Sequence, residues 1–405
     1  MTNKNIKRIQ VGAFKTSEKI RKHVMDVLDS GRISESINVN NFEKNWADFI
    51  GTKYSVAVNS GTSALIAGLH ALKHKYSLKE NSKIITTPLT YIATVNAIAL
   101  SGFKPVMVDI NSQNFGISPQ AIEKHLEEVK DPQEYIGIIP VHLFGYPVEM
   151  DKIIKIAKKY DLMILEDSAQ AHGSKYKGKN VGTFSLLSTF SFYIAHNIQA
   201  GQLGAVNTDD KELARLVRQI KSNGRMCACD VCTRSQGECY YGNAEFDPRF
   251  THNLIGYNFK TMDFEAAIAL AQLEDADDII KKRQHNVKTL NDYLSEFSDL
   301  LQLPIFSEDV SYLCYPLILK DDNISINKFK FNLEKEGVET RPLFSFIPHQ
   351  LAYKDLKAQY EGKLPTAEHL YYHGFYIGCH QYLEEDDLEY VYLKIKKVLS
   401  SFGRS

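Results

Sequence analysis

The sequence predicts an α/β protein with a mainly parallel sheet and helices on both faces. In the first two thirds of the 405 residues, short β-rich runs alternate with helical patterns, which is typical of such sheets. Several runs are followed closely by Gly, Thr, Asp or His, and ligands in these folds bind at the carboxyl ends of the strands. The predicted strands are Tyr54–Asn59, Lys83–Thr87, Pro105–Asp109, Tyr135–Val141, Leu162–Glu166, Leu187–Phe192 and Gly204–Thr208. The predicted helices are Thr62–Lys73, Tyr91–Leu100, Pro119–Val129, Met150–Lys159 and Lys211–Ser222.

The last third of the chain predicts a smaller α+β domain. A long helical pattern from Phe264 to Phe297 leads into it, and we therefore divide the chain into residues 1–262 and residues 263–405. A stretch rich in Cys, Gly and Tyr, residues 226–250, lacks periodicity and is too long for an ordinary loop, so we predict an insertion in the first domain. The elements expected in the second domain are a strand at Tyr312–Leu319 and helices at Asn327–Gly337 and Asp386–Ser400.

Composition and charge narrow the class of protein. Hydrophobic residues make up 44% and charged residues 24%, as in ordinary globular enzymes. The net charge of −1, with mixed signs, argues against nucleic acid and anionic membranes as partners. No apolar run approaches the roughly 18 residues of a membrane span. The segment Met1–Lys15 lacks the apolar core of a secretory signal, so we expect a cytoplasmic protein.

Four of the 6 cysteines lie within 13 residues. In a reducing compartment, such clustering favours metal ligation over disulfides. An iron–sulfur cluster, a structural zinc ion and free thiols are the three interpretations. Cys314 and Cys379 lie in apolar settings and are expected to be buried. The candidate metal ligands are Cys227, Cys229, Cys232 and Cys239.

The segment from Asn59 to Ser63 (Asn-Ser-Gly-Thr-Ser) ends a predicted strand and opens a predicted helix. Free backbone N–H groups at a helix N-terminus, with hydroxyls beside them, suit a phosphate. The alternative is an ordinary helix cap supplied by Ser60 or Thr62.

Asp167 comes at the end of an apolar strand, in the stretch Leu165–Gly173. A carboxylate at this place can pair with a protonated ring nitrogen and so make a pyridine ring an electron sink. The alternative is that Asp167 caps a turn.

A third stretch, from Ser188 to Val206, runs from an apolar strand through a polar loop to a strand that begins at Gly204. The loop contains one histidine, His196. A histidine in such a loop is either a structural residue or a general base.

Together, these stretches resemble the DegT/DnrJ/EryC1/StrS family of sugar aminotransferases. The resemblance extends from about Ser30 to Leu399 and implies the fold type I architecture of pyridoxal phosphate (PLP) enzymes, which is aspartate-aminotransferase-like. Other segments that carry it are Thr87–Tyr91 with Ala93 and Thr94, Val141–Gly145, Gly256–Lys260, Ala266 with Ala267, and Ala271–Leu273.

The resemblance implies a role for each matching residue. Thr62, Ser191 and the backbone of Gly61 and Ser63 would hold the cofactor phosphate, and Asn258 would reach that phosphate across a homodimer interface. Tyr91 would stack on the pyridine ring, Asp167 would pair with the ring nitrogen, and Gln170 would lie against the other face. Packing and turn formation are the alternatives for Tyr91 and Asn258.

His196 stands where the transaminating members carry lysine. Histidine cannot form the Schiff base by which that lysine holds PLP, but it can act as a general base. The replacement therefore implies non-covalent binding of the amine form of the cofactor, pyridoxamine phosphate (PMP). In the family it marks 3-dehydratases of nucleotide-linked 4-keto-6-deoxyhexoses, in which His196 would remove a proton from the cofactor. A second difference is Gln202-Leu203 where relatives usually show Glu-Gly.

Two types of dehydratase follow from the resemblance. One type uses glutamate to regenerate PMP and has no cluster. The other, which includes CDP-4-keto-6-deoxyglucose 3-dehydrase, carries a 2Fe–2S cluster that accepts electrons from a reductase, and the clustered cysteines favour this type. Ala169 stands where these relatives place a cysteine ligand, so Cys232 is the candidate for the fourth thiolate.

Two rival functions stay open at this point. One is a glutamate-dependent dehydratase whose cysteines bind zinc. The other is a non-enzymatic sensor that binds PLP or a nucleotide sugar, although such a sensor has no use for a base at His196.

Overall fold

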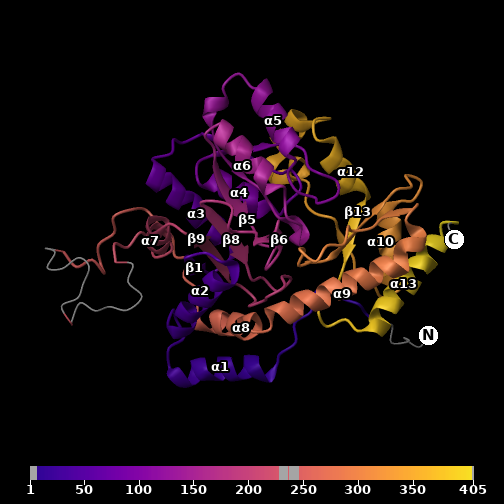
Figure 1. Cartoon of the computed structure of the whole chain (residues 1–405), viewed down its shortest axis with the longest axis horizontal. Coiled ribbons are helices and arrows are strands. Elements are labelled where there is room, and N and C mark those ends of the chain that lie inside the picture. Colours follow the sequence, from indigo (N-terminus) through magenta and orange to yellow (C-terminus); the bar gives the residue numbers. More distant parts are fainter. Residues whose placement is uncertain (1–6, 228–235, 237–245, 404–405) are drawn as a thin grey trace.

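The computed structural model describes residues 7–227, 236 and 246–403. Its larger sheet has seven strands in the order β1-β9-β8-β5-β4-β2-β3, and β9 runs antiparallel to both of its neighbours while the others are parallel (Figure 1). The predicted α/β class with a mainly parallel sheet is confirmed. The strands are β1 (Tyr54–Val58), β2 (Lys83–Thr86), β3 (Lys104–Met107), β4 (Tyr135–Ile139), β5 (Met163–Asp167), β8 (Leu187–Ser191) and β9 (Gly204–Thr208).

Alternate residues of each strand enter two different cores on the two faces of the sheet. In β1, Val56 and Val58 pack with one layer of helices and Ala57 with the other, as the two-residue period of a strand requires. The first layer is formed by α3 (Gly61–Tyr76), α4 (Ile92–Leu100) and α7 (Lys211–Ile220). The second is formed by α5 (Pro119–Glu128) and α6 (Met150–Lys159) at one end of the sheet, and by α2 (Ile37–Ile50) and α8 (Asp263–Leu273) at the other.

Polar side chains define where several helices begin. Ser118 accepts a hydrogen bond from the N–H of Ala121 at the start of α5, and Pro119 follows it at the first helical position. Asp210 accepts from the N–H groups of Glu212 and Leu213 at the start of α7. Each cap satisfies a backbone donor that the first turn of a helix leaves without a partner.

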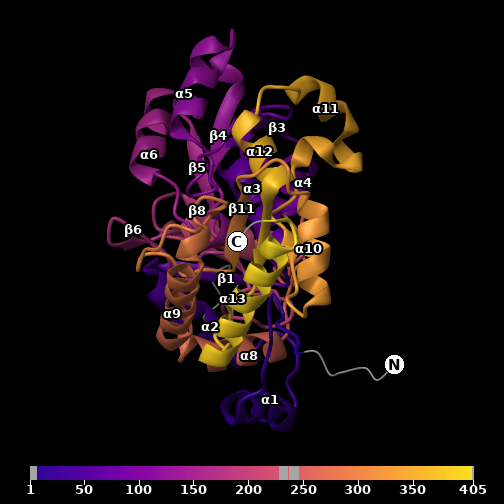
Figure 2. The ribbon, with the colours of Figure 1, turned by 90° about the vertical axis from the view of Figure 1, so that its right-hand side faces the viewer.

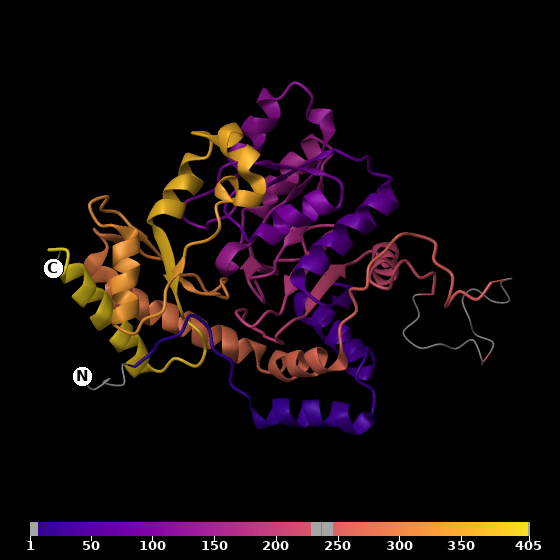
Figure 3. The same cartoon turned by 180° about the vertical axis from the view of Figure 1, so that it is seen from behind.

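The long helical pattern from Phe264 to Phe297 is two helices and not one. α8 ends at Leu273, and α9 (Ala276–Leu294) begins after Glu274 and Asp275 (Figure 3). Ala266 and Leu270 of α8 pack on the large sheet with α2, whereas Val287 and Leu290 of α9 belong to the C-terminal core. The break therefore lets one apolar pattern serve two cores. α1 (Glu18–Ser30), which the sequence did not predict, lies against α8 (Figure 1).

The C-terminal part contains a second sheet of four strands in the order β10-β11-β13-β12, with α10 and α13 packed nearby (Figure 2). Ile9 near the N-terminus also joins this core, and its N–H donates to the carbonyl of Gly337. The division at residue 262 stays a prediction. The remaining elements are β6 (Lys175–Tyr176), β7 (Lys179–Asn180), β10 (Leu301–Gln302), β11 (Tyr315–Leu319), α10 (Ile326–Lys335), β12 (Arg341–Pro342), α11 (Lys354–Tyr360), α12 (Pro365–His373), β13 (Gly374–Ile377) and α13 (Glu385–Ser400).

The two described ends of the cysteine-rich stretch lie side by side. The N–H of Cys227 donates to the carbonyl of Pro248 at 3.1 Å, and that of Met226 to Thr251 at 2.8 Å. The stretch therefore begins and ends at the same place in the fold, after α7. Among the described residues, no helix has both the length and the apolar character needed to cross a bilayer.

Candidate active site

The predicted phosphate-binding residues come together at the junction of β1, α3 and β8. Gly61 opens α3, and a Cβ placed on it would lie 2.6 Å from Cβ of Ser191, at the end of β8. A side chain on Gly204 would meet the carbonyl oxygen of Ser60 at 2.2 Å. Glycine at both positions lets β8 and β9 approach the helix N-terminus closely. This approach brings the Ser191 hydroxyl beside the first turn of α3.

The hydrogen bonds of this loop separate capping residues from residues that are available to a ligand. Ser60 caps α3 by accepting from the N–H of Ser63 at 3.1 Å, and the Ser63 hydroxyl donates to Asn59 Oδ1 at 2.6 Å. The Thr62 hydroxyl makes no hydrogen bond within residues 7–227, 236 and 246–403. The capping interpretation therefore holds for Ser60. The Thr62 hydroxyl and the N–H groups of Gly61 and Thr62 are available to an anion.

Asp167 is buried at the end of β5, in contact with Thr94 of α4. Its Oδ2 accepts from the Thr94 hydroxyl at 2.7 Å, and its Oδ1 from the N–H of Ala169 at 3.3 Å. Burial raises the pKa of this carboxyl, while the bonds from Thr94 and Ala169 and the charge of His142 oppose the rise. A raised pKa means that the carboxylate lacks a cation close enough to offset its desolvation. A protonated ring nitrogen would supply that cation.

Tyr91 and Gln170 are the two residues predicted to cover the faces of the cofactor ring. Tyr91 precedes α4, is 60% exposed, and adjoins Thr90, whose hydroxyl lies 3.1 Å from that of Thr94. Gln170 is buried, and its Oε1 accepts from the N–H of Phe144 at 2.8 Å. Tyr91 is therefore accessible to a ligand, and the amide of Gln170 is held by backbone.

His196 follows β8 and is buried, with its Nδ1 unpartnered among the described residues. The ring of His172 lies 6.0 Å away, centroid to centroid. Burial and then the charge of Arg283 lower the pKa of His196 to about 4, and the carbonyl of Tyr193 opposes them. A neutral imidazole with a free nitrogen can accept a proton from a ligand without first losing one of its own.

Two side chains that the sequence did not single out hold the His196 loop. Asn197 donates to the carbonyl of Ser311 at 2.7 Å. Arg283, fully buried in α9, donates to the carbonyls of Tyr312 at 3.1 Å and Leu313 at 2.9 Å. The segment 311–313 thus ties the loop to the C-terminal core. Arg283 lies on the apolar stripe of α9 with Val287 and Leu290, and a charge on such a stripe is the signal that could have identified it.

The difference at Gln202-Leu203 has a structural explanation. Leu203 is fully buried in the core that α2 and α8 share, and its carbonyl accepts from the N–H of Phe192 at 2.9 Å. The leucine thus fills a core position beside the end of β8, and the loop that carries His196 still returns to the sheet as β9.

Asn258 is exposed, and its segment adjoins the phosphate loop. Residue 258 forms an isolated bridge with Ser222, and the N–H of Asn59 donates to the carbonyl of Phe259 at 2.8 Å. The reach of Asn258 across a dimer interface stays a prediction.

Of the four candidate metal ligands, only Cys227 lies within the described residues. It is buried and unpaired. Cys229, Cys232 and Cys239 lie outside the described residues. Within the part of the chain that the structure describes, no group of three or more His, Cys, Asp or Glu residues could hold a metal ion.

Comparison with known families decides the identity of the fold. The family model described as "DegT/DnrJ/EryC1/StrS aminotransferase family" matches residues 15–396. The chain belongs to this family. It is therefore an enzyme of a PLP-dependent family that modifies nucleotide-linked sugars, and it has the fold of type I PLP enzymes.

Similar members of the family include aminotransferases and dehydratases. The GDP-perosamine synthase of Escherichia coli O157:H7 is 33% identical, with 94% of this chain and 96% of that protein covered. The dTDP-4-dehydro-2,6-dideoxy-D-glucose 3-dehydratase of Saccharopolyspora spinosa is 30% identical, with coverage of 89% and 80%. A structure of E. coli GDP-4-keto-6-deoxy-D-mannose-3-dehydratase with bound hydrated PLP is 25% identical, with a TM-score of 0.84 and coverage of 96% and 100%.

The site of this family member fits the cofactor. Gly61 and Ser191 approach too closely for any residue larger than glycine at position 61, which leaves backbone N–H groups open to a phosphate. The buried Asp167 needs a cation, and a pyridinium provides one. His196, predicted to stand at the position of the family's lysine, has an unpartnered ring nitrogen among the described residues.

Proposed function

We propose that this enzyme removes the hydroxyl at carbon 3 of a nucleotide-linked 4-keto-6-deoxyhexose, with PMP as cofactor and His196 as the base. The observation that carries the proposal is the buried, unpartnered Nδ1 of His196 at the place of the lysine of the aminotransferases. A residue that cannot form a Schiff base does not retain PLP covalently. The same residue is suited to proton transfer, and proton transfer is what elimination of a hydroxyl requires.

The binding roles follow from the contacts around the site. Thr62, Ser191 and the N–H of Gly61 would hold the cofactor phosphate, with Asn258 of a second subunit completing the site in a homodimer. The N–H of Ser63, which the sequence also assigned to the phosphate, is engaged by the Ser60 hydroxyl. Tyr91 would cover one face of the ring, and Gln170 the other. Asp167 would accept a hydrogen bond from the protonated ring nitrogen, because burial leaves this carboxylate in need of a cation.

When bound, the cofactor supplies an amine for the 4-keto group and a ring that accepts electrons. His196 takes a proton at its free nitrogen. Because burial and Arg283 hold the pKa of His196 near 4, the imidazole is neutral at physiological pH. Asn197 and Arg283 keep the loop in place through the segment 311–313. General base catalysis of this kind contributes roughly 10²–10⁴-fold to a rate.

The clustered cysteines complete the proposal. We infer that they bind an iron–sulfur cluster, of the 2Fe–2S type, that relays electrons from a reductase. Two observations support this inference. Four cysteines lie within 13 residues of the sequence, and both described ends of the stretch meet after α7. A structural zinc ion in a glutamate-dependent dehydratase is the second candidate, and four thiolates would also satisfy it.

Turnover of CDP-, GDP- and dTDP-linked 4-keto-6-deoxyhexoses with PMP and an electron-donating reductase tests the reaction. We expect a product that lacks the oxygen at carbon 3, and an His196→Ala variant that has lost turnover by about two orders of magnitude or more. A product that gains an amino group at carbon 4 would identify an aminotransferase and overturn the proposal. Tight ligand binding without any change in cofactor absorbance would identify a sensor.

Borohydride trapping gives a readout that does not depend on the substrate. Wild-type protein with PLP should release its cofactor on denaturation after reduction, whereas His196→Lys should retain it covalently. Assays of iron, sulfide and zinc on anaerobically purified protein separate the cluster from the zinc site. Turnover with L-glutamate and no reductase would favour the glutamate-dependent enzyme.

A further inference from the structure

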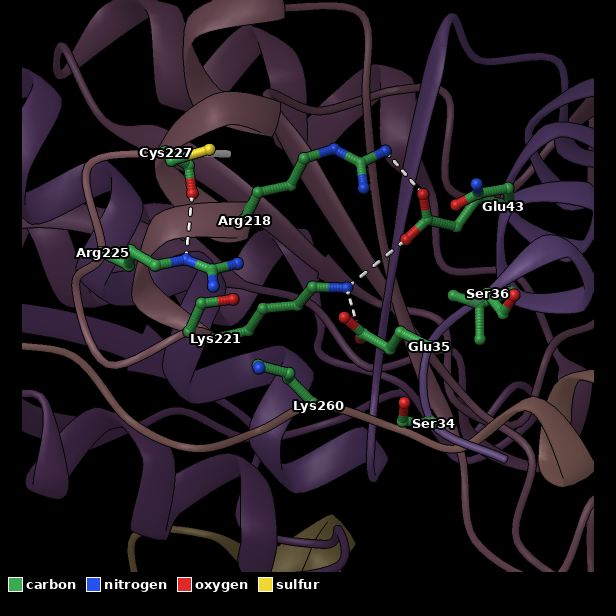
Figure 4. Close-up of a pocket in the computed structure, with 12 residues that line it drawn as sticks. Ser34, Glu35, Ser36, Glu43, Arg218, Lys221, Arg225, Cys227 and Lys260 are labelled. Carbon is green, nitrogen blue, oxygen red and sulfur yellow. Dashed lines mark hydrogen bonds and ion pairs between the residues drawn. The ribbon is translucent and has the colours of Figure 1, made fainter. Parts of the chain in front are cut away.

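A polar cavity lies between α2, the end of α7 and the segment that precedes α2. It has a volume of about 210 Å³ (Figure 4). None of the residues predicted to bind PLP or PMP lines it, whereas Cys227, a candidate metal ligand, does. The wall is almost wholly polar, with Val39 as its single aliphatic residue. Such a wall excludes an apolar ligand and favours a charged one.

The wall carries more cations than carboxylates. Arg218, Lys221, Arg225 and Lys260 face Glu35 and Glu43, which leaves an excess of two positive charges. Ser34, Ser36, Asn40 and Ser222 add hydroxyl and amide groups. Cations combined with such donors are the groups that bind phosphate oxygens.

Both carboxylates are already engaged by the two cations of α7 and its C-terminal cap. Lys221 is buried, and its Nζ lies 2.7 Å from Glu35 and 3.6 Å from Glu43. Arg218 lies 2.5 Å from the other oxygen of Glu43. Figure 4 shows these contacts as dashed lines that run from Arg218 and Lys221 to Glu43 and Glu35. The Lys221 and Arg218 pairs therefore form a neutral, fixed wall.

The excess charge comes from Arg225 and Lys260. Arg225 donates from Nε to the carbonyl of Cys227 at 3.3 Å. Its terminal nitrogens have no carboxylate partner within residues 7–227, 236 and 246–403, and neither does the ammonium of Lys260. The two side chains come from segments that the structure holds together, because Phe259 donates to the carbonyl of Lys221 and Arg225 pairs with His252. A ligand with two negative charges would balance the charges of Arg225 and Lys260.

The cavity adjoins the loop that would hold the cofactor phosphate. Ala57 of β1 donates its N–H to Glu43 at 2.7 Å and accepts from Lys221 at 2.9 Å. Two residues later, Asn59 begins the phosphate loop and donates to Phe259, the neighbour of Lys260. A ligand in the cavity thus lies next to the cofactor loop and contacts none of its residues.

We propose that this cavity binds a diphosphate group, with Arg225 and Lys260 supplying the two charges that bind it. The natural source would be the diphosphate of a nucleotide-linked substrate, a step that rests on the proposed function. Free pyrophosphate presents the same chemistry. Binding of a diphosphate in this cavity depends neither on His196 nor on the dehydration reaction.

Calorimetric titration of the cofactor-saturated protein with inorganic pyrophosphate tests the site. Saturation with PMP occupies the first phosphate loop, so binding there is excluded. We expect saturable binding that weakens roughly ten- to a hundredfold in Arg225→Gln and in Lys260→Gln, because each removes one charge-assisted contact. Lys158→Gln, which removes an exposed charge on α6, should bind like the wild type. Arg225→Lys, which keeps the charge, should retain most of the affinity.

The outcomes separate this proposal from the proposed function. His196→Ala should bind pyrophosphate normally even though it does not turn over. Nucleoside diphosphates that bind more tightly than pyrophosphate, with the same loss in Arg225→Gln, identify the nucleotide-linked source. Equal affinity identifies a site for diphosphate alone. The proposal is overturned if wild-type protein shows no saturable binding, or if folded Arg225→Gln and Lys260→Gln bind as the wild type does.

Discussion

Two adjacent carboxylates at the end of β5 have opposite environments. Glu166 accepts from the N–H groups of Gly182 at 2.8 Å and Phe184 at 2.9 Å, from the Ser185 hydroxyl at 2.7 Å, and lies 3.1 Å from His142. Asp167 has two donors and a raised pKa. Successive residues of a strand point to opposite faces, so Glu166 completes the fold on one face, while Asp167 lies on the other with only two donors.

The two histidines near these carboxylates show the same contrast. His142 bonds Glu166 through Nε2 and accepts from the N–H of Val148 through Nδ1 at 3.2 Å. His196 keeps Nδ1 unpartnered although it is also buried. His142 is satisfied by the protein, whereas a buried nitrogen without a protein partner calls for another one, such as a ligand or a water molecule. Three measurements sharpen this comparison.

The largest effect is expected at Glu166. Glu166→Ala removes the acceptor of two backbone N–H groups, one hydroxyl and one imidazole inside the core, and it should lower the free energy of unfolding by about 3–5 kcal/mol. Urea unfolding of the cofactor-free protein measures the change. Asp167→Ala is the matched control, because its two donors make it less costly to remove. Equal losses in the two variants would contradict the distinction between them.

Asp167→Asn should affect cofactor binding rather than folding. The amide keeps an acceptor for Thr94 but cannot offset the charge of a pyridinium. The affinity for PMP is therefore expected to fall about a hundredfold, since losing one partner of a buried charge pair costs about 2–5 kcal/mol. Absorbance titration of the cofactor measures the affinity. Unchanged affinity together with lower stability would show that Asp167 only caps a turn.

The smallest effect is the pH dependence that His196 gives the cofactor-free protein. Its pKa in the folded state is about 4, below the ordinary value of 6.5, so the unfolded chain takes up a proton that the folded chain does not. The stability from this group is complete above pH 6.5 and is lost as the pH falls toward 4. At pH 5.5 the loss should be about 1.4 kcal/mol.

Unfolding curves of wild type and His196→Gln at pH 7.5 and pH 5.5 measure this loss. The free energy of unfolding of the wild type, relative to that of His196→Gln, should be lower at pH 5.5 than at pH 7.5. His74→Gln, on the exposed part of α3, provides the baseline for a histidine that is not buried. A pH-independent difference between wild type and His196→Gln would show that His196 is not held neutral.

Local patterns accounted for much of the fold. β9 and α6 have the predicted bounds, and most of the other predicted strands and helices differ from the structure by one to three residues at an end. The sequence did not predict α1 and α2, and the other failures are non-local. The antiparallel insertion of β9 between β1 and β8 depends on pairing across the sheet, and the break between α8 and α9 depends on which core each half packs against. Neither leaves a periodic signal in the chain.

The sequence by itself determined the chemistry that is available: a histidine in the loop after a strand, an acid at a strand end, and hydroxyls at a helix start. Residue identity is fixed by the chain, and its order along alternating strands and helices limits where ligands bind. The tertiary structure decided which of these groups the protein satisfies and which it leaves for a ligand. Partners tens to hundreds of residues away decide the roles of Glu166, Asp167 and Arg283, and of the cations in the polar cavity. The reason is that hydrogen bonding and burial depend on distance in space.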